Sequence, residues 1–339
     1  MSPTRRGERC AAAAIASAAV VAVACNAPMS TLRSAGSGAS GALSVFWFMV
    51  ALAALVYVVV IAVMIFAVAR RRSESASVDL TERSALPVIV GGAVIPAAIL
   101  VVVFLAGLAA MRAYPARGAE RAVSYKVTGY QWWWDVEYED PMLDRRFRTA
   151  NEIHVPVGRP VRITLVSGDV IHSFWVPRLQ GKIDLIPGDT NEIRFVARKP
   201  GTYRGQCAEY CGLQHAHMAL TVVAEDSASF EQWLATQRAP AAVPADSVTA
   251  LGERTVVTGP CAMCHTIRGT EAAGQIAPDL THVGSRATIA AGALPNSLGN
   301  IEAWITNAQS LKPGARMPSL TQFTGTQLRA MALYLQSLR

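Results

Sequence analysis

Two long uncharged segments dominate the hydrophobic pattern of the chain, at residues 43–69 and 85–111. Because about 20 apolar residues cross a bilayer as a helix, both segments are predicted to span a membrane, as a helical hairpin over residues 43–111. Arg70, Arg71 and Arg72 directly follow the first span. Arginines collect in cytoplasmic loops, so we expect the loop of the hairpin inside the cell and both of its ends outside.

A shorter apolar run at residues 11–24 comes after three arginines within the first nine residues. This is the layout of a secretory signal, here residues 1–25. Small residues before Cys25 also fit lipoprotein processing, with Cys25 as the lipidated terminus. Simple cleavage nearby and an uncleaved anchor are the alternatives. Residues 34–41 are small as well, and their composition predicts a flexible linker before the first span.

Beyond the hairpin, apolar residues recur at every second position. Residues 123–127 and 161–165 alternate between apolar and polar side chains, as half-buried strands do. Turn sequences rich in Pro and Gly separate such runs. Short strands at this spacing predict a sandwich or barrel over residues 115–226.

An Ala- and Pro-rich linker at residues 239–244 leads to a different pattern. Residues 301–308 are expected to be helical, and the pair Thr324 and Gln327 predicts the cap of a final helix. The predicted fold class is a multidomain membrane protein. It comprises a two-helix transmembrane hairpin, an all-β domain and a small all-α domain at residues 245–339.

Composition agrees with this division. Hydrophobic residues make up 52% of the chain and charged residues 16%, as a part-embedded protein requires. The formal net charge is +7, and its excess lies mainly around the apolar segments. Since no basic stripe with interleaved aromatic residues is present, we expect no nucleic-acid partner.

The motif Cys261-Ala-Met-Cys264-His265 has C-x-x-C-H spacing. Two thiols so placed can form thioether bonds to the vinyl groups of a haem, and the adjacent imidazole then reaches the iron. A disulfide, a zinc half-site and a redox C-x-x-C are the alternatives. The second axial ligand is expected to be Met317, in a loop marked by Pro and Gly, and Met331 and His282 are its rivals.

A second constellation lies within twelve residues, in Cys207-Ala-Glu-Tyr-Cys211-Gly-Leu-Gln-His215-Ala-His-Met218. Thiolates, imidazole and thioether are the ligands of copper sites, and His172 offers a further imidazole upstream. Single blue-copper sites use one Cys, so two cysteines predict two copper ions with bridging sulfurs. The alternative is a disulfide between the two cysteines.

These residues resemble a known family. Over residues 43–226 the chain resembles cytochrome c oxidase subunit II, and most of residues 245–339 resembles class I cytochromes c. The resemblance rests on the hairpin and on three motifs, Tyr130-Gln-Trp-Trp-Trp134, Asp169-Val-Ile-His-Ser-Phe-Trp175-Val-Pro177 and the run from Cys207 to Met218. It implies a cupredoxin-like Greek-key barrel that holds a dinuclear copper centre of the CuA type.

The resemblance also implies a role for each residue of the centre. The terminal ligands would be His172 and His215, the bridges Cys207 and Cys211, and the axial ligands Met218 and the carbonyl of Glu209. The side chain of Glu209 would reach a magnesium ion at the boundary with subunit I, whose ligand shell this chain alone does not complete.

Three further roles follow from the same resemblance. Electrons would enter from the donor through Trp132, although a run of three tryptophans also fits a packing belt. The carboxylate of Asp169 would help a donor to dock, and Pro278 would orient His265. Family members often carry a Glu early in the second span, where this chain has Ile89. We therefore assign it no proton-uptake residue.

The implied function is electron relay in a bacterial plasma membrane. An external cytochrome c would reduce haem c, and electrons would pass through CuA to subunit I, which reduces oxygen and translocates protons. Other oxidase subunits and membrane lipid are the remaining partners. The alternative class is a copper-delivery or assembly protein with an attached c-type haem. A quinol oxidase subunit and a nitrous oxide reductase-like protein fit the motifs less well.

Overall fold

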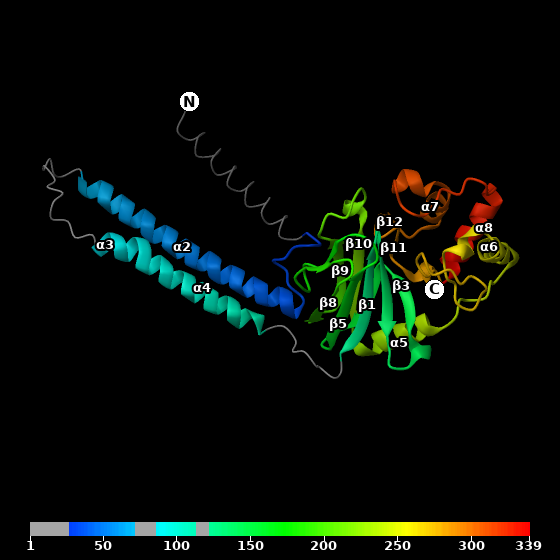
Figure 1. Cartoon of the computed structure of the whole chain (residues 1–339), viewed down its shortest axis with the longest axis horizontal. Coiled ribbons are helices and arrows are strands. Elements are labelled where there is room, and N and C mark those ends of the chain that lie inside the picture. Colours follow the sequence, from blue (N-terminus) through cyan, green and yellow to red (C-terminus); the bar gives the residue numbers. More distant parts are fainter. Residues whose placement is uncertain (1–26, 72–85, 113–121) are drawn as a thin grey trace, which may run out of the picture. The chain divides into compact units, whose positions relative to one another are not determined.

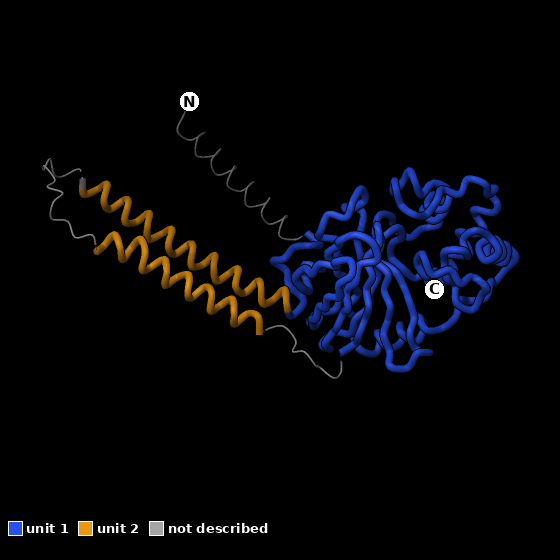
Figure 2. Tube along the Cα trace, viewed as in Figure 1, with its two compact units in different colours: residues 1–37, 115–339 blue, residues 38–114 orange. Residues whose placement is uncertain are grey.

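The computed structural model describes residues 27–71, 86–112 and 122–339 of the chain. The expected signal at residues 1–25, with Cys25, lies outside the described residues, as does Arg72 of the hairpin loop. Two compact units are present, a helical one within residues 38–114 and a larger one that holds the rest (Figure 2).

The helical unit consists of two apolar helical segments. The first is α2 (Ser37–Arg71), and the second runs through α3 (Leu86–Ile89), the π-helical η1 (Val90–Val94) and α4 (Ile95–Met111). The π turn closes with a bond from the Ile95 N–H to the Val90 carbonyl, directly before Pro96, whose missing N–H breaks the regular helical ladder. Both segments are long and apolar enough to cross a membrane.

The β domain contains two sheets of five strands each (Figure 1). One sheet has the order β3-β2-β1-β5-β8 and the other the order β4-β10-β9-β6-β7. The strands of the first sheet are β1 (Val123–Tyr130), β2 (Trp133–Glu139), β3 (Phe147–Ala150), β5 (Pro160–Ser167) and β8 (Thr190–Val196). Those of the second are β4 (Glu152–Pro156), β6 (His172–Trp175), β7 (Ile183–Leu185), β9 (Gly201–Cys207) and β10 (Ala219–Glu225).

The predicted alternation is confirmed in these strands. In β5, Val161, Ile163 and Leu165 are buried, whereas the residues between them are half-exposed. They share one apolar cluster with residues of the other sheet, such as Ile153 and Val222. The core of the domain therefore lies between the two sheets, as in a cupredoxin-like fold.

The flexible linker predicted at residues 34–41 is wrong. Ala35 is buried, its N–H donates to the Arg178 carbonyl at 2.7 Å, and its own carbonyl accepts the Arg198 N–H at 2.7 Å. A Cβ on Gly36 would lie 2.2 Å from the Leu179 carbonyl oxygen. Small residues occur here because the backbone approaches the β domain closely, and α2 begins immediately afterwards at Ser37.

A helix that the sequence analysis missed closes the β domain. It is α5 (Ser227–Arg238), capped by Asp226, whose side chain accepts the Ala228 and Ser229 N–H groups. Phe230 and Leu234 belong to the apolar cluster of the β domain. The linker at residues 239–244 therefore follows a helix rather than a strand.

The C-terminal domain is helical, as predicted. It contains α6 (Ser247–Val257), η4 (Pro260–Met263), η5 (Val283–Ser285), the short hairpin β11 (Thr288–Ile289) and β12 (Leu294–Pro295), α7 (Leu298–Leu311) and α8 (Gly325–Ser337). The capping box of Thr324 and Gln327 is confirmed. A Cβ on Gly252 of α6 would lie 2.1 Å from the Ala330 carbonyl oxygen of α8, so the crossing of these helices depends on glycine. The predicted fold class is confirmed.

Candidate copper and haem sites

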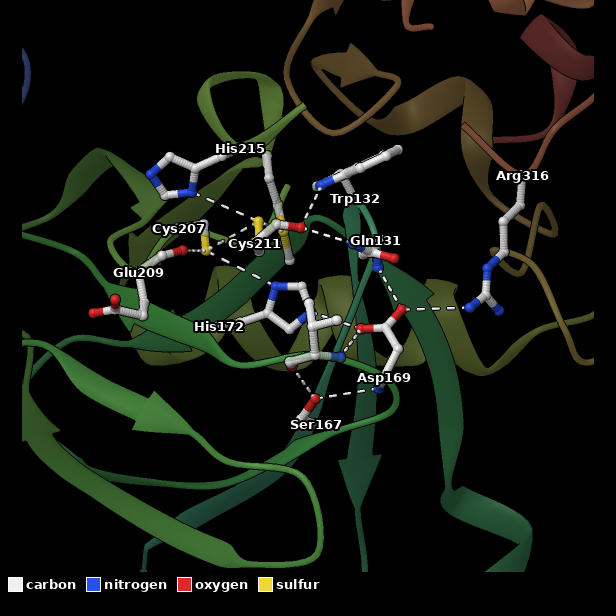
Figure 3. A network of polar contacts seen from close by, with 12 residues as sticks. Gln131, Trp132, Ser167, Asp169, His172, Cys207, Glu209, Cys211, His215 and Arg316 are labelled. Atoms are coloured by element: carbon white, nitrogen blue, oxygen red, sulfur yellow. Dashed lines mark hydrogen bonds and ion pairs between the residues drawn. The ribbon is translucent and has the colours of Figure 1, made fainter. Parts of the chain in front are cut away.

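Two adjacent strands and one loop bring the candidate copper ligands together (Figure 3). β9 ends at Cys207 and β10 begins at Ala219, so the loop between them carries the other clustered candidates. His172 opens β6, which pairs with β9 through Phe174 and Cys207. Adjacent strands therefore place an imidazole 35 residues upstream beside the thiols.

The distances within this cluster are short. The Sγ atoms of Cys207 and Cys211 are 3.8 Å apart, and His172 Nδ1 lies 3.9 Å from Cys207 Sγ. His215 Nδ1 and Met218 Sδ lie 3.6 Å and 3.8 Å from Cys211 Sγ. The carbonyl oxygen of Glu209 is 3.2 Å from Cys207 Sγ.

The donor chemistry of the cluster fits a copper centre. Both cysteines are buried free thiols, so the structure does not contain the alternative disulfide. The neighbouring Cys211 thiol, with help from His172, lowers the pKa of Cys207 far below its ordinary value, and the Cys207 thiolate raises the pKa of Cys211. Two thiolates so close repel each other without a cation. Soft sulfur and imidazole donors suit copper.

Asp169 fixes the orientation of His172. His172 Nε2 donates to Asp169 Oδ1 at 2.8 Å, and this bond leaves Nδ1 directed at the sulfur atoms. The carboxylate also accepts the Gln131 and Val170 N–H groups at 2.8 Å and 2.7 Å. A carboxylate behind a ligating imidazole is the usual support of a metal site. Donor docking by Asp169 stays a prediction.

The three consecutive tryptophans occupy different environments. Trp132 reaches the copper cluster, where its Nε1 donates to the Cys211 carbonyl at 2.9 Å. Trp133 stacks on Tyr130, and Trp134 is fully buried with its ring centroid 5.8 Å from that of Phe174. Only Trp132 thus contacts a candidate ligand residue by hydrogen bond, which supports the role that the resemblance implies for it.

The carbonyl and the side chain of Glu209, for which different roles are expected, lie in different surroundings. Its carbonyl faces the cluster, whereas its side chain is 44% exposed and lies 3.9 Å from Lys182. The two remaining histidines of the β domain have other partners. His217 Nδ1 contacts Gln214 Oε1 at 2.7 Å, and His154 contacts two carboxylates, 2.7 Å from Glu225 and 3.2 Å from Glu152.

The C-x-x-C-H motif forms one tight turn. The N–H groups of Cys264 and His265 both donate to the Cys261 carbonyl, at 3.1 Å and 2.9 Å. His265 Nδ1 donates to the Pro278 carbonyl at 2.7 Å, and burial lowers the pKa of His265. The imidazole is thereby held neutral with Nε2 free to ligate, as a haem iron requires.

The candidates for the second axial ligand differ in their surroundings. Met331 is fully buried in α8, and His282 is buried with Nε2 3.1 Å from the Ala239 carbonyl oxygen. Met317 is half-buried on the loop after α7, where its side chain packs on the same apolar cluster as Cys261. It stays the predicted ligand.

A buried arginine in the C-terminal domain also suits a bound haem. Arg286 is 9% exposed, and its Nε has no hydrogen-bond partner among the described residues. Its charge also contributes to the lowered pKa of His265. An unpaired buried guanidinium donor suits a bound group that carries carboxylates, as haem does.

One functional candidate was missed by the sequence analysis. Lys312 is 3% exposed, and its Nζ donates to the carbonyls of Trp132, His217 and Ala290 at 2.7, 2.8 and 2.9 Å. Burial lowers the pKa of Lys312 to about 7. No sequence signal marks this residue, because a lysine beside Pro and Gly usually lies in an exposed loop.

Comparison with known families gives a match for each of the two domains. The profile of the periplasmic domain of cytochrome c oxidase subunit II matches residues 123–225, and that of cytochrome c matches residues 249–339. Residues 123–225 therefore form a domain of the cytochrome c oxidase subunit II family, and residues 249–339 form a cytochrome c domain. Cytochrome c oxidase subunit 2 of Alkalihalophilus pseudofirmus is 37% identical over 220 residues, which make up 65% of this chain and 62% of that protein.

Other relatives give the same result. Subunit 2 from Bacillus sp. strain PS3 is 31% identical over 231 residues, 65% of this chain and 63% of that protein. This chain thus spans less than two thirds of the length of both relatives. The crystal structure of the periplasmic domain of subunit II from Bradyrhizobium japonicum is 34% identical and covers 35% of this chain and 94% of that domain, with a TM-score of 0.33.

Proposed function

We propose that this chain is the electron-input subunit of a cytochrome c oxidase. It accepts electrons from an external cytochrome c through its own haem c and a CuA centre, and delivers them to subunit I. There oxygen is reduced to water and protons are translocated. The observation that carries the proposal is the cluster of two thiols, two imidazoles and a thioether, in which each neighbouring pair lies within 4 Å and all members except the half-buried His215 are buried.

Each residue of the two sites has a proposed role as a ligand or as the support of a ligand. Cys207 and Cys211 would bridge two copper ions, His172 and His215 would be terminal ligands, and Met218 and the Glu209 carbonyl would be axial. When bound, the copper pair and the haem each supply a one-electron carrier. The chain's own contribution is to hold the donor atoms in place, since Asp169 fixes His172 and Pro278 fixes His265.

The same ligand set assigns the oxygen chemistry to a partner. If the two cysteines, the two histidines, Met218 and the Glu209 carbonyl held the copper ions, every position would be taken by the protein and none would be left for a substrate. Oxygen reduction accordingly belongs to subunit I. The exposed Glu209 side chain is available to a magnesium ion whose other ligands come from that subunit.

We infer that α2 and the α3–α4 segment anchor the chain in the bacterial plasma membrane, with lipid around them and both cofactor domains on the outer side. The family relationship and the apolar length of the helices support this location. A reporter fused behind Arg339 should be active only if it is exported, and activity in the cytoplasm would contradict the topology.

Metal analysis of the purified full chain tests the function. We expect two copper ions and one covalent haem per chain, and an electron paramagnetic resonance signal from one electron shared between two copper nuclei. Cys211→Ser should lose this signal and keep the haem, whereas Cys264→Ser should do the reverse. A single copper ion per chain, or zinc in its place, would refute the proposal.

A further inference from the structure

We call the β domain the copper domain and the C-terminal helical domain the haem domain. Two loops of the haem domain contact the copper domain beside the candidate copper ligands. The first is the tip of the β11–β12 hairpin at residues 290–292, where the Ala291 carbonyl accepts the Ala219 N–H at 3.0 Å. The second follows α7, where the Pro313 carbonyl accepts Gln214 Nε2 at 3.0 Å. Gln214 and Ala219 each adjoin a candidate copper ligand. We call this contact between residues 290–292, 312–316 and 214–219 the seam.

Lys312 lies at the centre of the seam. An ammonium group has three donors, and here each has an acceptor. Two of these, the Trp132 and His217 carbonyls, belong to the copper domain, and the third, the Ala290 carbonyl, belongs to the hairpin tip. One side chain therefore ties both haem-domain loops to two segments of the copper domain.

The loop that Lys312 begins lies on Trp132. Gly314 has a φ of 82°, and a Cβ placed on it would be 3.3 Å from Cη2 of the Trp132 ring. The other edge of the same indole donates through Nε1 to the Cys211 carbonyl. Trp132 consequently lies between the loop that leads to Met317 and a bridging cysteine, and it is only 8% exposed.

The backbone of the hairpin tip gives an independent sign that the seam is built for this contact. Ala290 and Ala291 have φ values of 54° and 59°, in the left-handed region that residues with a Cβ rarely adopt. Such conformations persist where surrounding contacts hold them. The carbonyls of these two alanines are the ones bonded to Lys312 and to Ala219.

We propose that Lys312 is a positioning residue that clamps the haem domain onto the copper domain over Trp132. The clamp makes the tethered domain the donor to the copper site, and it leaves the haem domain as the surface that an external donor meets. The redox part of this inference rests on the proposed function. In each transfer the haem iron loses one electron and the copper pair gains it, with no change in bonds or protons, and the external cytochrome c restores the electron.

Hydrogen exchange of the full chain tests the clamp directly. The Ala219 amide donates across the seam, so its exchange reports separation of the domains. In Lys312→Met we expect the peptide that contains Ala219 to exchange at least about tenfold faster, because the buried amino group and its three hydrogen bonds across the seam are lost. Peptides of β5 and α8 should keep their protection, which shows that both domains stay folded. Lys199→Met removes an exposed lysine of the copper domain and should change nothing.

Flash photolysis of the same two variants separates positioning from folding. Bimolecular reduction of the haem by cytochrome c should be unchanged in Lys312→Met, whereas the following transfer to copper should be slower, because the contact of the haem-domain loop with Trp132 is weakened. Unchanged exchange at Ala219 would overturn the clamp. Faster exchange with an unchanged transfer rate would overturn its role in electron delivery. Failure of the proposed function would be a different result, namely a wild-type chain without copper or without any transfer, in which exchange at Ala219 still responds to Lys312→Met.

Discussion

Replacing Asp169 with Asn tests how strongly the copper site depends on the carboxylate behind His172. The two oxygens of Asp169 accept three donors, His172 Nε2–H and the Gln131 N–H in partly buried bonds and the Val170 N–H in an exposed one. Asparagine keeps one acceptor oxygen and presents an amide nitrogen in place of the other. In either orientation of the amide, one of the two partly buried donors, His172 Nε2–H or the Gln131 N–H, loses its acceptor.

The expected loss can be worked out from that unpaired donor. Leaving a buried donor unsatisfied costs about 1–3 kcal/mol, which corresponds to roughly a 5- to 150-fold weaker copper affinity if the cost falls on the bound state. Substitutions of carboxylates behind ligating histidines lower metal affinity by about 10- to 100-fold. The expected loss of copper affinity for Asp169→Asn is therefore about one to two orders of magnitude.

The assay is a copper titration of the metal-free full chain against a chelator of known affinity. Asp189→Asn is the matched control, since Asp189 is exposed and its side chain accepts the N–H of the adjacent Thr190. The control should bind copper as the wild type does. An affinity of Asp169→Asn within about twofold of the wild type would show that His172 does not need this carboxylate.

Two further predictions concern stability. Gly252→Ala should destabilise the haem domain by about 1–3 kcal/mol, because its Cβ would meet the Ala330 carbonyl oxygen at 2.1 Å. Urea unfolding measures this loss, and Gly299→Ala, with nothing within 4 Å of the new Cβ, should show none. The second concerns pH. Burial acts to raise the pKa of Glu152, but hydrogen bonds with His154 and the Ala287 N–H outweigh it and lower the pKa. A carboxyl with a lowered pKa stabilises the fold above its ordinary pKa, and this stability is lost as the pH falls through the lowered value. Glu152→Gln should therefore flatten the acid limb of the unfolding curve, and an unchanged limb would contradict this assignment.

Most of the fold could be predicted from the hydrophobic pattern of the sequence. The two apolar helices, the alternating strands β1 and β5 and the capped helix α8 were all predicted, since each follows from local pattern. The linker at residues 34–41 was predicted wrongly because Gly, Ser and Ala favour flexibility and close backbone approach equally. Only the neighbouring Leu179 carbonyl, far away in sequence, distinguishes the two.

The candidate sites show a similar division. Cys207, Cys211, His215 and Met218 are close in sequence, so their spacing alone predicted a metal cluster. The hydrogen bond that directs His172 Nδ1 at the sulfurs, and the Pro278 carbonyl that frees His265 Nε2, depend on tertiary contacts. The role of Lys312 could not be predicted from the sequence, because its acceptor at Trp132 is 180 residues away along the chain.

Two basic residues of the haem domain, Arg316 and Lys312, lie near the copper site and differ in burial. Asp169 is 12% exposed at its side chain and lies 3.5 Å from the guanidinium of Arg316 in the haem domain, whose side chain is 65% exposed. An exposed ion pair contributes little and is screened by salt. The buried, fully hydrogen-bonded Lys312 is screened far less, so it outweighs Arg316 in holding the domains together. Ionic strength should then act on the encounter with an external cytochrome c rather than on the seam.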